Sequence, residues 1–408
     1  MQELNLYISK MNKLESCKLC SQEVKVISNS NLKMLVPDQY PLDGNIDICI
    51  CQNCDFVFSR SDSSANDYLS YYRDFNKHQN RDEKNRVFDR AYFQRVCQFL
   101  SEHKTGGIEG CRVLDWGSGS LIFEEVANHF GAKSVSNFDV GGEKLKQLFD
   151  IVISTHCFEH LLDPLSSIQE LTSCVVENGF VLIAVPDLSR YDQFYYGPYS
   201  HFDLEHINHF VSNSLQKLFE LAGLEVVATY QGERQVQARL SYSEVVVLGR
   251  KSQKLITLSK TTHFDGVRYV GALIERYDKD LQIMKAKFVQ TLENFKNSSL
   301  NSEVKICLYG LSSYAFRFLN LIDRDGLISQ IEIFADSDSR LTGLTIAGGK
   351  SIIDKMTFEN LSSNVTAPSR IMVLVVAINS DKIMGMFEKE FPNIPVVVLP
   401  PETLNRKI

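Results

Sequence analysis

The sequence predicts an α/β fold in which short buried strands alternate with helices. An apolar strand, Val113-Leu114-Asp115-Trp116, runs into the turn Gly117-Ser118-Gly119, and a helix is expected behind it over Leu121–Phe130. The runs Asp150–Ser154 and Phe180–Pro186 have the length and composition of strands that are buried on both faces. This order of strand, glycine turn, helix and further strands is typical of a mostly parallel, Rossmann-like sheet.

The glycine turn predicts a nucleoside-binding site. Gly117 and Gly119 let the backbone approach a ligand with no Cβ in the way. Asp139 closes the next strand, twenty-four positions after Asp115, and its carboxylate can accept hydrogen bonds from ribose hydroxyls. The order D-x-G-x-G, unlike G-x-G-x-x-G, indicates S-adenosylmethionine (SAM) more than a dinucleotide. We therefore expect Asp115, Gly117, Gly119 and Asp139 to bind this cofactor.

The connection after Asp139 is unusually short. Only the ten residues Val140–Phe149 separate it from Asp150. A crossover between parallel strands needs about a dozen residues or more. We therefore expect the third strand of the sheet to be missing. SAM then either binds with a reduced adenine pocket or does not bind, and the intact Asp115 and glycine turn favour binding.

Composition narrows the class of protein. The 408 residues allow two or three domains, and a net charge of −7 argues against a nucleic-acid partner. No apolar run approaches the length of a membrane span, and the N-terminus has no signal-peptide pattern. Ten cysteines without a secretory signal suggest reduced thiols. These observations predict a cytoplasmic protein without a membrane partner.

Two C-x-x-C pairs predict a metal site. Cys17 and Cys20 form the first pair, and Cys51 and Cys54 form the second. Four thiolates close a tetrahedral, structural Zn²⁺ site and leave no open position for catalysis. A redox pair is the alternative, which a second C-x-x-C makes less favoured. Cys49 is expected to be a packed strand residue. The metal would stabilise a module whose apolar core is too small to fold alone.

Five parts are expected from these patterns: a zinc module (1–60), a helical connector (61–109), the first Rossmann-like domain (110–250), a long linking helix (251–300) and a second Rossmann-like domain (301–408). The connector holds three clustered tyrosines and an amphipathic helix from Phe88 to Leu100. The linking helix has an apolar seam from Val270 to Phe295 with spacings of three, four or seven. The seam predicts packing against this chain's own domains, with a dimeric coiled coil as the alternative.

The C-terminal domain repeats the nucleotide-site pattern in weaker form. A strand, Val304–Tyr309, is followed by Gly310 and a helix over Ser313–Ile322, and the strand Ile331–Ala335 ends at Asp336. Two further strands are expected at 371–377 and 396–399. Because Gly310 stands without a second glycine, a purely structural domain remains as open as a nucleotide site.

The loop Glu159-His160-Leu161-Leu162-Asp163-Pro164 and the strands around it resemble class I SAM-dependent methyltransferases over about residues 90–250. The order of zinc module, SAM domain and second Rossmann-like domain resembles the sugar C-methyltransferase family across nearly the whole chain. The strings Gly310–Tyr314 and Phe334–Gly343 resemble the third domain of that family. The resemblance implies methylation of a carbon next to the ketone of a nucleotide-linked deoxyketosugar, which lies between the second and third domains.

The family has a catalytic Tyr-x-Glu-His string after its fifth strand. In this chain Glu205 and His206 match its last two positions, but Asp203 stands where the tyrosine is expected. This departure puts the substrate, and C-methylation itself, in question. O- or N-methylation of another glycan or metabolite is therefore a second hypothesis. A relative that binds sugar nucleotides but has lost SAM is a third.

The chemistry of the segment assigns roles to its residues. A neutral imidazole can remove the weakly acidic proton next to a ketone, so His206 is the expected base, and Glu205 orients it or polarises the sugar. His201 and His209 could bind an enolate oxygen or a hydroxyl. The alternative is that all three histidines, His206 included, simply bind backbone groups around a buried loop. Glu159 and His160 are expected beside the sulfonium of SAM. The weaker candidates, with the substrate-binding residues expected, are Tyr72, Tyr195, Tyr196, Tyr199, Asp203, Gly310 and Asp336.

The expected partners follow from this reading. A nucleotide sugar is the expected substrate, in the synthesis of a surface polysaccharide or a natural product. The expected cofactors are SAM and a structural Zn²⁺. The chain is expected to be a monomer or a homodimer.

Overall fold

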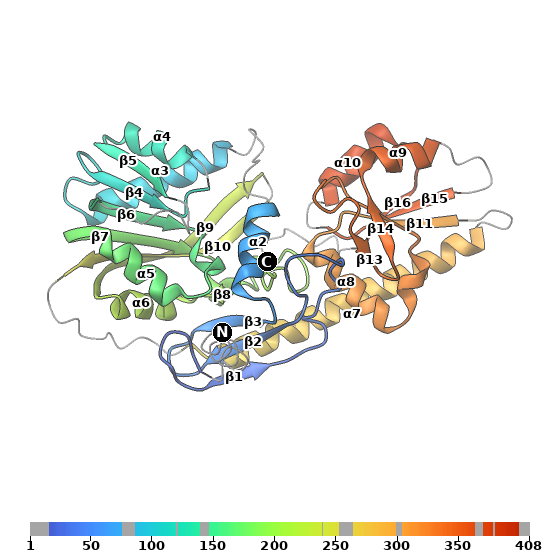
Figure 1. Ribbon diagram of the computed structural model, residues 1–408, viewed down its shortest axis with the longest axis horizontal. Helices are drawn as coiled ribbons and strands as arrows, with labels where there is room; N and C mark the ends of the chain where they lie inside the picture. Colours follow the sequence, from blue (N-terminus) through green and yellow to red (C-terminus); the bar gives the residue numbers. More distant parts are fainter. Residues whose placement is uncertain are drawn as a thin grey trace, which may run out of the picture.

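The computed structural model describes residues 16–75, 86–119, 121–138, 147–238, 240–252, 264–298, 304–363, 370–377 and 380–399. Figure 1 shows two α/β domains at opposite ends of the molecule, with an N-terminal sheet and the long helix α7 running beneath and between them. The predicted α/β class is confirmed. Among the described residues, no helix is both long and apolar enough to cross a membrane.

The N-terminal sheet contains β1 (Val24–Ile27), β2 (Ile46–Cys51) and β3 (Val57–Ser61), all antiparallel. Its fourth strand, β8 (Asn208–His209), comes from a distant part of the chain and pairs with β3. Helix α2 (Ala65–Asp74) follows. The two ends of the N-terminal sheet thus belong to different parts of the sequence.

The first α/β domain has a six-stranded sheet in the order β5-β4-β6-β7-β10-β9. The strands β5, β4, β6 and β7 are parallel, and β10 and β9 are antiparallel to their neighbours. The strand bounds are β4 (Arg112–Trp116), β5 (Ser134–Phe138), β6 (Phe149–Thr155), β7 (Val175–Val185), β9 (Leu224–Gln237) and β10 (Leu240–Lys251). The helices are α3 (Arg86–His103), α4 (Ile122–His129), α5 (Pro164–Ser173) and α6 (Ser212–Leu221).

Local sequence explains where these helices form. The side chain of Asp163 caps α5 by accepting from the backbone N–H of Ser166 at 3.0 Å, and Pro164 occupies the first turn. Helix α3 buries Tyr92, Phe93 and Leu100 in the same core as α4 and β4, as its apolar spacing predicts.

Strand β5 forms one edge of the sheet, directly beside β4. Among the described residues no further strand pairs with β5, and the absence of the usual third strand stays a prediction. Residues 139–146 lie outside the described residues, and so does the predicted ribose-binding Asp139. The sheet passes from β5 on one side of β4 to β6 on the other, so the ligand-binding crevice of such a fold lies beyond the carboxyl ends of these strands.

Helix α7 (Gly266–Ser298) contains the predicted apolar seam. Its buried members share one core with the N-terminal sheet and the C-terminal domain: Val270, Ile274, Tyr277, Leu281, Met284 and Phe288. Phe295 packs against the same core and is partly buried. The seam therefore packs against this chain's own domains, which was the first of the two alternatives.

The C-terminal domain has a second six-stranded sheet, in the order β13-β14-β12-β11-β15-β16. All its pairs are parallel except β13 with β14. The strands are β11 (Val304–Tyr309), β12 (Ile333–Ala335), β13 (Thr345–Ile346), β14 (Lys350–Ile353), β15 (Arg370–Val375) and β16 (Val396–Val398). The helices are α8 (Ser313–Arg324), α9 (Lys355–Ser363) and α10 (Ser380–Glu390).

One buried cation joins the C-terminal domain to the rest of the chain. Arg317 of α8 is 1% exposed, and its guanidinium donates at 2.8 Å to each of the backbone carbonyls of Tyr199 and Phe202. It also donates to the carbonyl of Leu32 at 3.3 Å. Burial lowers the pKa of Arg317 to about 10. The residue thus connects the C-terminal domain, the N-terminal module and the loop that precedes β8.

Candidate active site

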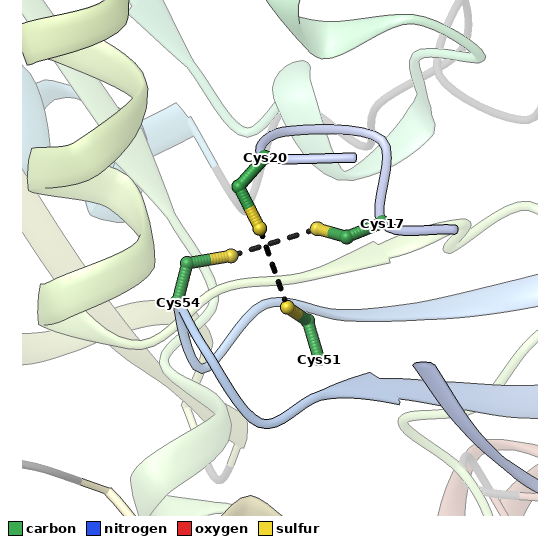
Figure 2. Close-up of side chains that lie close together, drawn as sticks. All are labelled: Cys17, Cys20, Cys51 and Cys54. Atoms are coloured by element: carbon green, nitrogen blue, oxygen red, sulfur yellow. Dashed lines mark hydrogen bonds between the residues drawn. The ribbon is translucent and has the colours of Figure 1, made fainter. Parts of the chain in front are cut away.

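The four predicted metal ligands converge at one end of the N-terminal sheet. Figure 2 shows the four side chains pointing toward one centre from two knuckles. The Sγ atoms of Cys17 and Cys54 lie 3.5 Å apart, and so do those of Cys20 and Cys51. Four thiolates around a tetrahedral Zn²⁺ place their sulfurs roughly 3.8 Å apart, which follows from a Zn–S bond of about 2.3 Å. The donor set and its spacing therefore fit zinc.

The surroundings of the cysteines support this arrangement. The backbone N–H of Leu19 donates to Sγ of Cys17 at 3.3 Å, and the side-chain amide of Asn53 donates to Sγ of Cys20 at 3.5 Å. Donors of this kind stabilise thiolates around a metal. Cys49 lies in β2, fully buried, as expected of a packed strand residue.

The predicted cofactor turn follows β4. Gly117 has φ +80°, a conformation that side chains with a Cβ rarely adopt, and its N–H donates to the carbonyl of Phe138 at 2.8 Å. A Cβ built on Gly119 meets no atom within 4 Å, so this position faces open space. Asp115 is 3% exposed at the end of β4. Burial raises its pKa to about 7, against opposing effects of Ser118 and Arg234.

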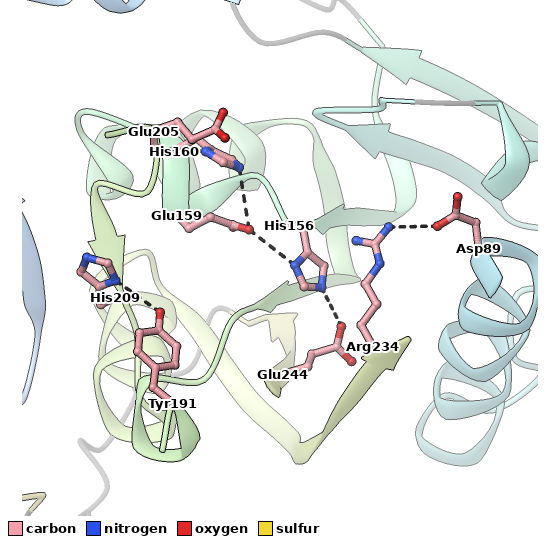
Figure 3. A network of polar contacts seen from close by, with 9 residues as sticks. All are labelled: Asp89, His156, Glu159, His160, Tyr191, Glu205, His209, Arg234 and Glu244. Carbon is pink, nitrogen blue, oxygen red and sulfur yellow. Dashed lines mark hydrogen bonds and ion pairs between the residues drawn. The ribbon is translucent and has the colours of Figure 1, made fainter. Parts of the chain in front are cut away.

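A second group of residues lies at the carboxyl end of β6. His156 has φ +51°, and its Nε2 lies 3.0 Å from Oε2 of Glu244 on β10. Its Nδ1 lies 3.5 Å from Oε1 of Glu159, and that oxygen lies 3.9 Å from Nε2 of His160. Glu159 and His160 belong to the short 3₁₀ helix η3 (Phe158–His160). Figure 3 shows this chain of carboxylates and imidazoles, with the ion pair of Asp89 and Arg234 beside it.

The predicted catalytic segment packs directly against η3. Nδ1 of His160 lies 2.9 Å from the carbonyl oxygen of Glu205, and the backbone N–H of Ile207 donates to the carbonyl of Glu159 at 2.7 Å. The ring centroids of His160 and His206 are 4.9 Å apart. The structure therefore brings together the two Glu-His pairs that the sequence singled out.

The electrostatic surroundings shift the pKa values of Glu159 and His206. Burial alone would raise the pKa of Glu159, but its hydrogen bond with His156 and the nearby His160 and His206 hold that pKa at about 2. Burial and His160 lower the pKa of His206 below its usual value, although Glu159 and other carboxylates oppose the shift. An ionised carboxylate therefore lies beside a neutral imidazole, which is the form a general base requires.

Glu159, His160 and His206 lie close together. One ligand atom each from Glu159, His160 and His206 lies within 4.8 Å of the others. At this spacing the charge of one group acts on the pKa values of the others.

His201 and His209 bind internal groups of the fold. Nε2 of His209 lies 3.1 Å from Oγ of Ser59, and its Nδ1 lies 3.2 Å from the hydroxyl of Tyr191. Nε2 of His201 lies 2.7 Å from the carbonyl oxygen of Phe194. The ring of His201 stacks on that of Tyr191, with 3.9 Å between the ring centroids. Burial lowers the pKa of His201 to about 3 and that of His209 well below its usual value. The contact of His201 matches the backbone-binding alternative of the sequence interpretation, whereas the two partners of His209 are side chains.

The tyrosine candidates occupy different surroundings. The ring of Tyr72 meets that of His160 edge-on at 6.0 Å, and its buried hydroxyl has no hydrogen-bond partner among the described residues. The hydroxyls of Tyr199 and Tyr195 donate to Asp278 and Asp280 of α7. Tyr196 is also buried, about 5 Å from the ring of Tyr242. Of the four, Tyr72 is the one that packs on the Glu-His cluster.

The expected substrate residues Asp203, Gly310 and Asp336 bind backbone groups of their own segments. Oδ1 of Asp203 accepts from the N–H of Leu204 at 2.6 Å. Gly310 has φ +91° and donates to the carbonyl of Ala335 at 3.0 Å. Asp336 accepts from the backbone N–H of Leu311 through one oxygen, and from that of Asp338 at 2.7 Å through the other. The carboxylate thus stabilises the turns of its own domain.

Sequence reasoning missed three residues of the cluster. Tyr71 of α2 donates its hydroxyl to Oε2 of Glu205 at 3.1 Å, although 134 positions separate them. His156 and Glu244 were also missed. An acid at the start of the otherwise apolar run Val245–Leu248 was the available signal for Glu244.

Comparison with known proteins identifies the first α/β domain. A family model described as a methyltransferase domain matches residues 77–229. The chain therefore contains a class I SAM-dependent methyltransferase domain. None of the curated proteins matches the chain.

Several solved structures are similar to part of the chain. A SAM-dependent methyltransferase from Thermotoga maritima, described as a possible histamine N-methyltransferase, is 14% identical with a TM-score of 0.29; the likeness covers 46% of this chain and 96% of that one. A SAM-dependent methyltransferase from Mesorhizobium loti is 12% identical with a TM-score of 0.29, over 38% of this chain and 96% of that one. A coclaurine N-methyltransferase is 10% identical with a TM-score of 0.29, and the likeness covers 42% of this chain and 76% of that one.

Proposed function

We propose that this methyltransferase methylates a carbon next to the ketone of a nucleotide-linked deoxyketosugar. The observation that carries the proposal is the contact of Glu205 and His206 with the Glu159–His160 loop, beyond the carboxyl ends of the strands β4 and β6. In an open α/β sheet this is the region where ligands bind. SAM supplies an electrophilic methyl group when it is bound.

His206 acts as the base in this proposal. Its lowered pKa keeps the imidazole neutral near pH 7, so that one ring nitrogen can accept the proton of the acidic C–H bond. The electron pair of that bond stays on the substrate, which becomes an enolate whose carbon attacks the methyl group. Glu205, held by Tyr71 at 3.1 Å, orients the sugar through its carboxylate.

Tyr72 is proposed to donate to the enolate oxygen. Its hydroxyl is buried without a partner among the described residues, and its ring packs on His160. A buried hydroxyl gains most from a hydrogen bond to a group on which negative charge develops. Because burial and Glu205 raise the pKa of Tyr72 far above its usual value, it stays a donor.

A second candidate function is O- or N-methylation of another glycan or metabolite. Asp203 in place of the tyrosine of the resembled family favours it, because this carboxylate already accepts from the backbone of Leu204. A neutral imidazole at His206 can deprotonate a hydroxyl or an ammonium as well as a C–H bond. The two candidates differ in the atom that carries the new methyl group.

Transfer of a labelled methyl group from SAM to a panel of nucleotide ketosugars tests the proposal. NMR of the product locates the new carbon. The proposal predicts a C–CH₃ group next to the ketone, and loss of transfer in His206→Asn. His103→Asn, on the exposed end of α3, is the matched control and is expected to keep full transfer. Methylation at oxygen or nitrogen would favour the second candidate, and no transfer to any ketosugar would contradict the first.

A further inference from the structure

We propose that Glu159 is the counter-ion of the imidazolium that forms on His206, and so a positioning residue for the base and not a contact of the cofactor. The proposal rests on the function proposed for His206 above. It assigns a purpose to a buried carboxylate that the methyl-transfer steps leave unused.

The burial of Glu159 needs an explanation. The residue is 2% exposed, and its Oε2 has no hydrogen-bond partner among the described residues. Oε1 faces Nδ1 of His156 at 3.5 Å and Nε2 of His160 at 3.9 Å. A buried, ionised carboxylate with one unbound oxygen carries a large desolvation penalty. Such a group persists where its charge has a use.

The orientation of His160 directs the cluster toward His206. Because Nδ1 of His160 binds the carbonyl oxygen of Glu205, it carries the proton in the neutral ring, and Nε2 faces Glu159. The same contact fixes the backbone next to His206, whose ring lies 4.9 Å from that of His160. A carboxylate oxygen of Glu159 and a ring nitrogen of His206 lie within 4.8 Å. This separation is short enough for strong attraction in a buried site.

The titratable neighbours of His206 act on its pKa in both directions, and the buried rings of His201 and His209 also interact with it. His160 from η3 opposes a charge on His206, while Glu159 from η3 favours it, as do Glu205 and Asp203 from the loop of His206 itself. Further away, His156 faces Glu159 from just after β6, Glu244 of β10 faces His156, and Tyr71 of α2 faces Glu205. Among these carboxylates, Glu159 is the one that is both fully buried and held in contact with His160.

The step is balanced in protons and electrons. The substrate C–H bond breaks, its proton goes to His206, and its electron pair stays on the substrate. A positive charge therefore appears on His206 within 4.8 Å of the fixed negative charge of Glu159. When the new C–C bond forms, the C–S bond of the donor breaks, and its electron pair leaves with sulfur. The proton on His206 then passes to solvent.

A divalent cation held by Glu159, His160 and His206 would be a different use of the same atoms. The contact of Oε1 of Glu159 with His156 favours the counter-ion, because that oxygen already faces a histidine. The separation of 3.9 Å between Oε1 and Nε2 of His160 also exceeds the roughly 3 Å between neighbouring ligands of one ion, which follows from bonds of about 2.0–2.1 Å.

The direct test is NMR titration of the His206 ring in zinc-loaded protein with ¹⁵N-labelled histidine, assigned by loss of its signals in His206→Asn. In Glu159→Gln the pKa of His206 should fall by about one unit or more, since an opposite charge within about 4–6 Å shifts a pKa by about one to three units. In Glu170→Gln, the same change on the exposed face of α5, it should not move. An unmoved pKa in folded Glu159→Gln overturns the proposal.

A second variant gives a shift of the opposite sign. His156→Gln removes the imidazole that faces Glu159, so the carboxylate acts more fully on His206 and the pKa of His206 should rise. This prediction stands if Glu159→Gln does not fold, and a fall in the pKa would overturn it. Zinc-loaded wild type could also bind one equivalent of Mn²⁺ in addition to its zinc. If His206→Asn lost that Mn²⁺, the proposal would be overturned in favour of a cation site.

The titration needs no substrate, so its outcome is separable from that of the proposed function. If the ketosugar panel gives no product but the pKa of His206 moves as expected, the pair stands and the substrate assignment fails. If methylation occurs but the pKa does not move, the function stands and Glu159 is not the counter-ion.

Discussion

Ser59 of β3 and His209 of β8 join the N-terminal sheet to the loop that holds Glu205 and His206. Oγ of Ser59 lies 3.1 Å from Nε2 of His209, and the backbone N–H of Ser59 donates to the carbonyl of Ile207 at 2.7 Å. Cys51 and Cys54 lie at the turn between β2 and β3. The cysteine site is therefore only a few residues from the strand that contacts the loop of Glu205 and His206.

Removal of zinc should release this loop. Cys20→Ser is expected to lose the metal, and hydrogen exchange should then show lost protection at the amide of Ser59. The reason is that metal binding stabilises the folded conformation of the two knuckles that the four cysteines hold together. Cys49→Ala, a buried neighbour outside the cluster, is the matched control and should keep one zinc per chain. Unchanged protection at Ser59 in metal-free protein would contradict this account.

Arg317 should contribute to stability through its contacts with three segments. Arg317→Met leaves the carbonyls of Tyr199, Phe202 and Leu32 without this donor, and each buried unsatisfied group costs about 1–3 kcal/mol. Relief of the buried charge offsets part of that cost. We expect the free energy of unfolding to fall by about 2 kcal/mol or more in chemical denaturation.

The control for Arg317→Met is Arg324→Met. Arg324 lies on the same helix but is exposed, where it contacts Ser30 and Asn31. It should change the stability by less than about 0.5 kcal/mol. Equal losses in the two variants would show that the buried contacts of Arg317 have no special weight.

Stability should fall with acid because His201 and His209 are buried as neutral rings. Both have pKa values lowered in the folded state, to about 3 for His201, while the unfolded chain takes up protons near pH 6.5. Their contribution is therefore complete above about pH 6.5 and is lost as pH falls toward about 3. Denaturation between pH 8 and 4 should show a weaker pH dependence in His201→Gln. A slope equal to that of wild type would count against it.

Tyr71→Phe should slow methyl transfer without unfolding the protein. It removes the hydroxyl that holds Oε2 of Glu205 at 3.1 Å, a bond of about 1.5–3 kcal/mol, which corresponds to at least roughly a tenfold lower rate. Tyr230→Phe, at a half-exposed position on β9, is the control and should leave the rate unchanged. A rate equal to that of wild type in Tyr71→Phe would remove Tyr71 from the site.

Local patterns predicted most elements of this fold. Strand β11 has the expected bounds Val304–Tyr309, and α7 (Gly266–Ser298) lies within the linking helix expected over 251–300, because apolar spacing indicates such elements. The cysteine site was also predictable, since its two knuckles are each local in sequence. Asp139 lies outside the described residues, so its predicted contact with ribose stays a prediction.

The parts that sequence did not reveal depend on contacts between distant residues. Nothing near His209 in sequence indicates that Ser59, 150 positions away, binds its ring. Arg317 donates a hydrogen bond to the carbonyl of Tyr199, 118 positions away. Because every residue has a backbone carbonyl, the sequence does not indicate which one Arg317 contacts. Three histidines within nine residues looked alike as candidates, and only the packing distinguishes His206, near Glu159, from the two that bind internal groups.

The measurement that tests the central claim most directly is calorimetric titration of zinc-loaded protein with SAM and its demethylated product. We expect binding on the order of 10 µM or tighter. In Gly117→Leu it should weaken at least about tenfold, because a residue with a Cβ at φ +80° costs roughly 1–2 kcal/mol and shifts the turn away from this conformation. Gly106→Leu, also at a positive φ but on the exposed turn after α3, should bind as wild type does. Absence of binding in folded, zinc-loaded wild type would contradict SAM-dependent methyl transfer by this chain.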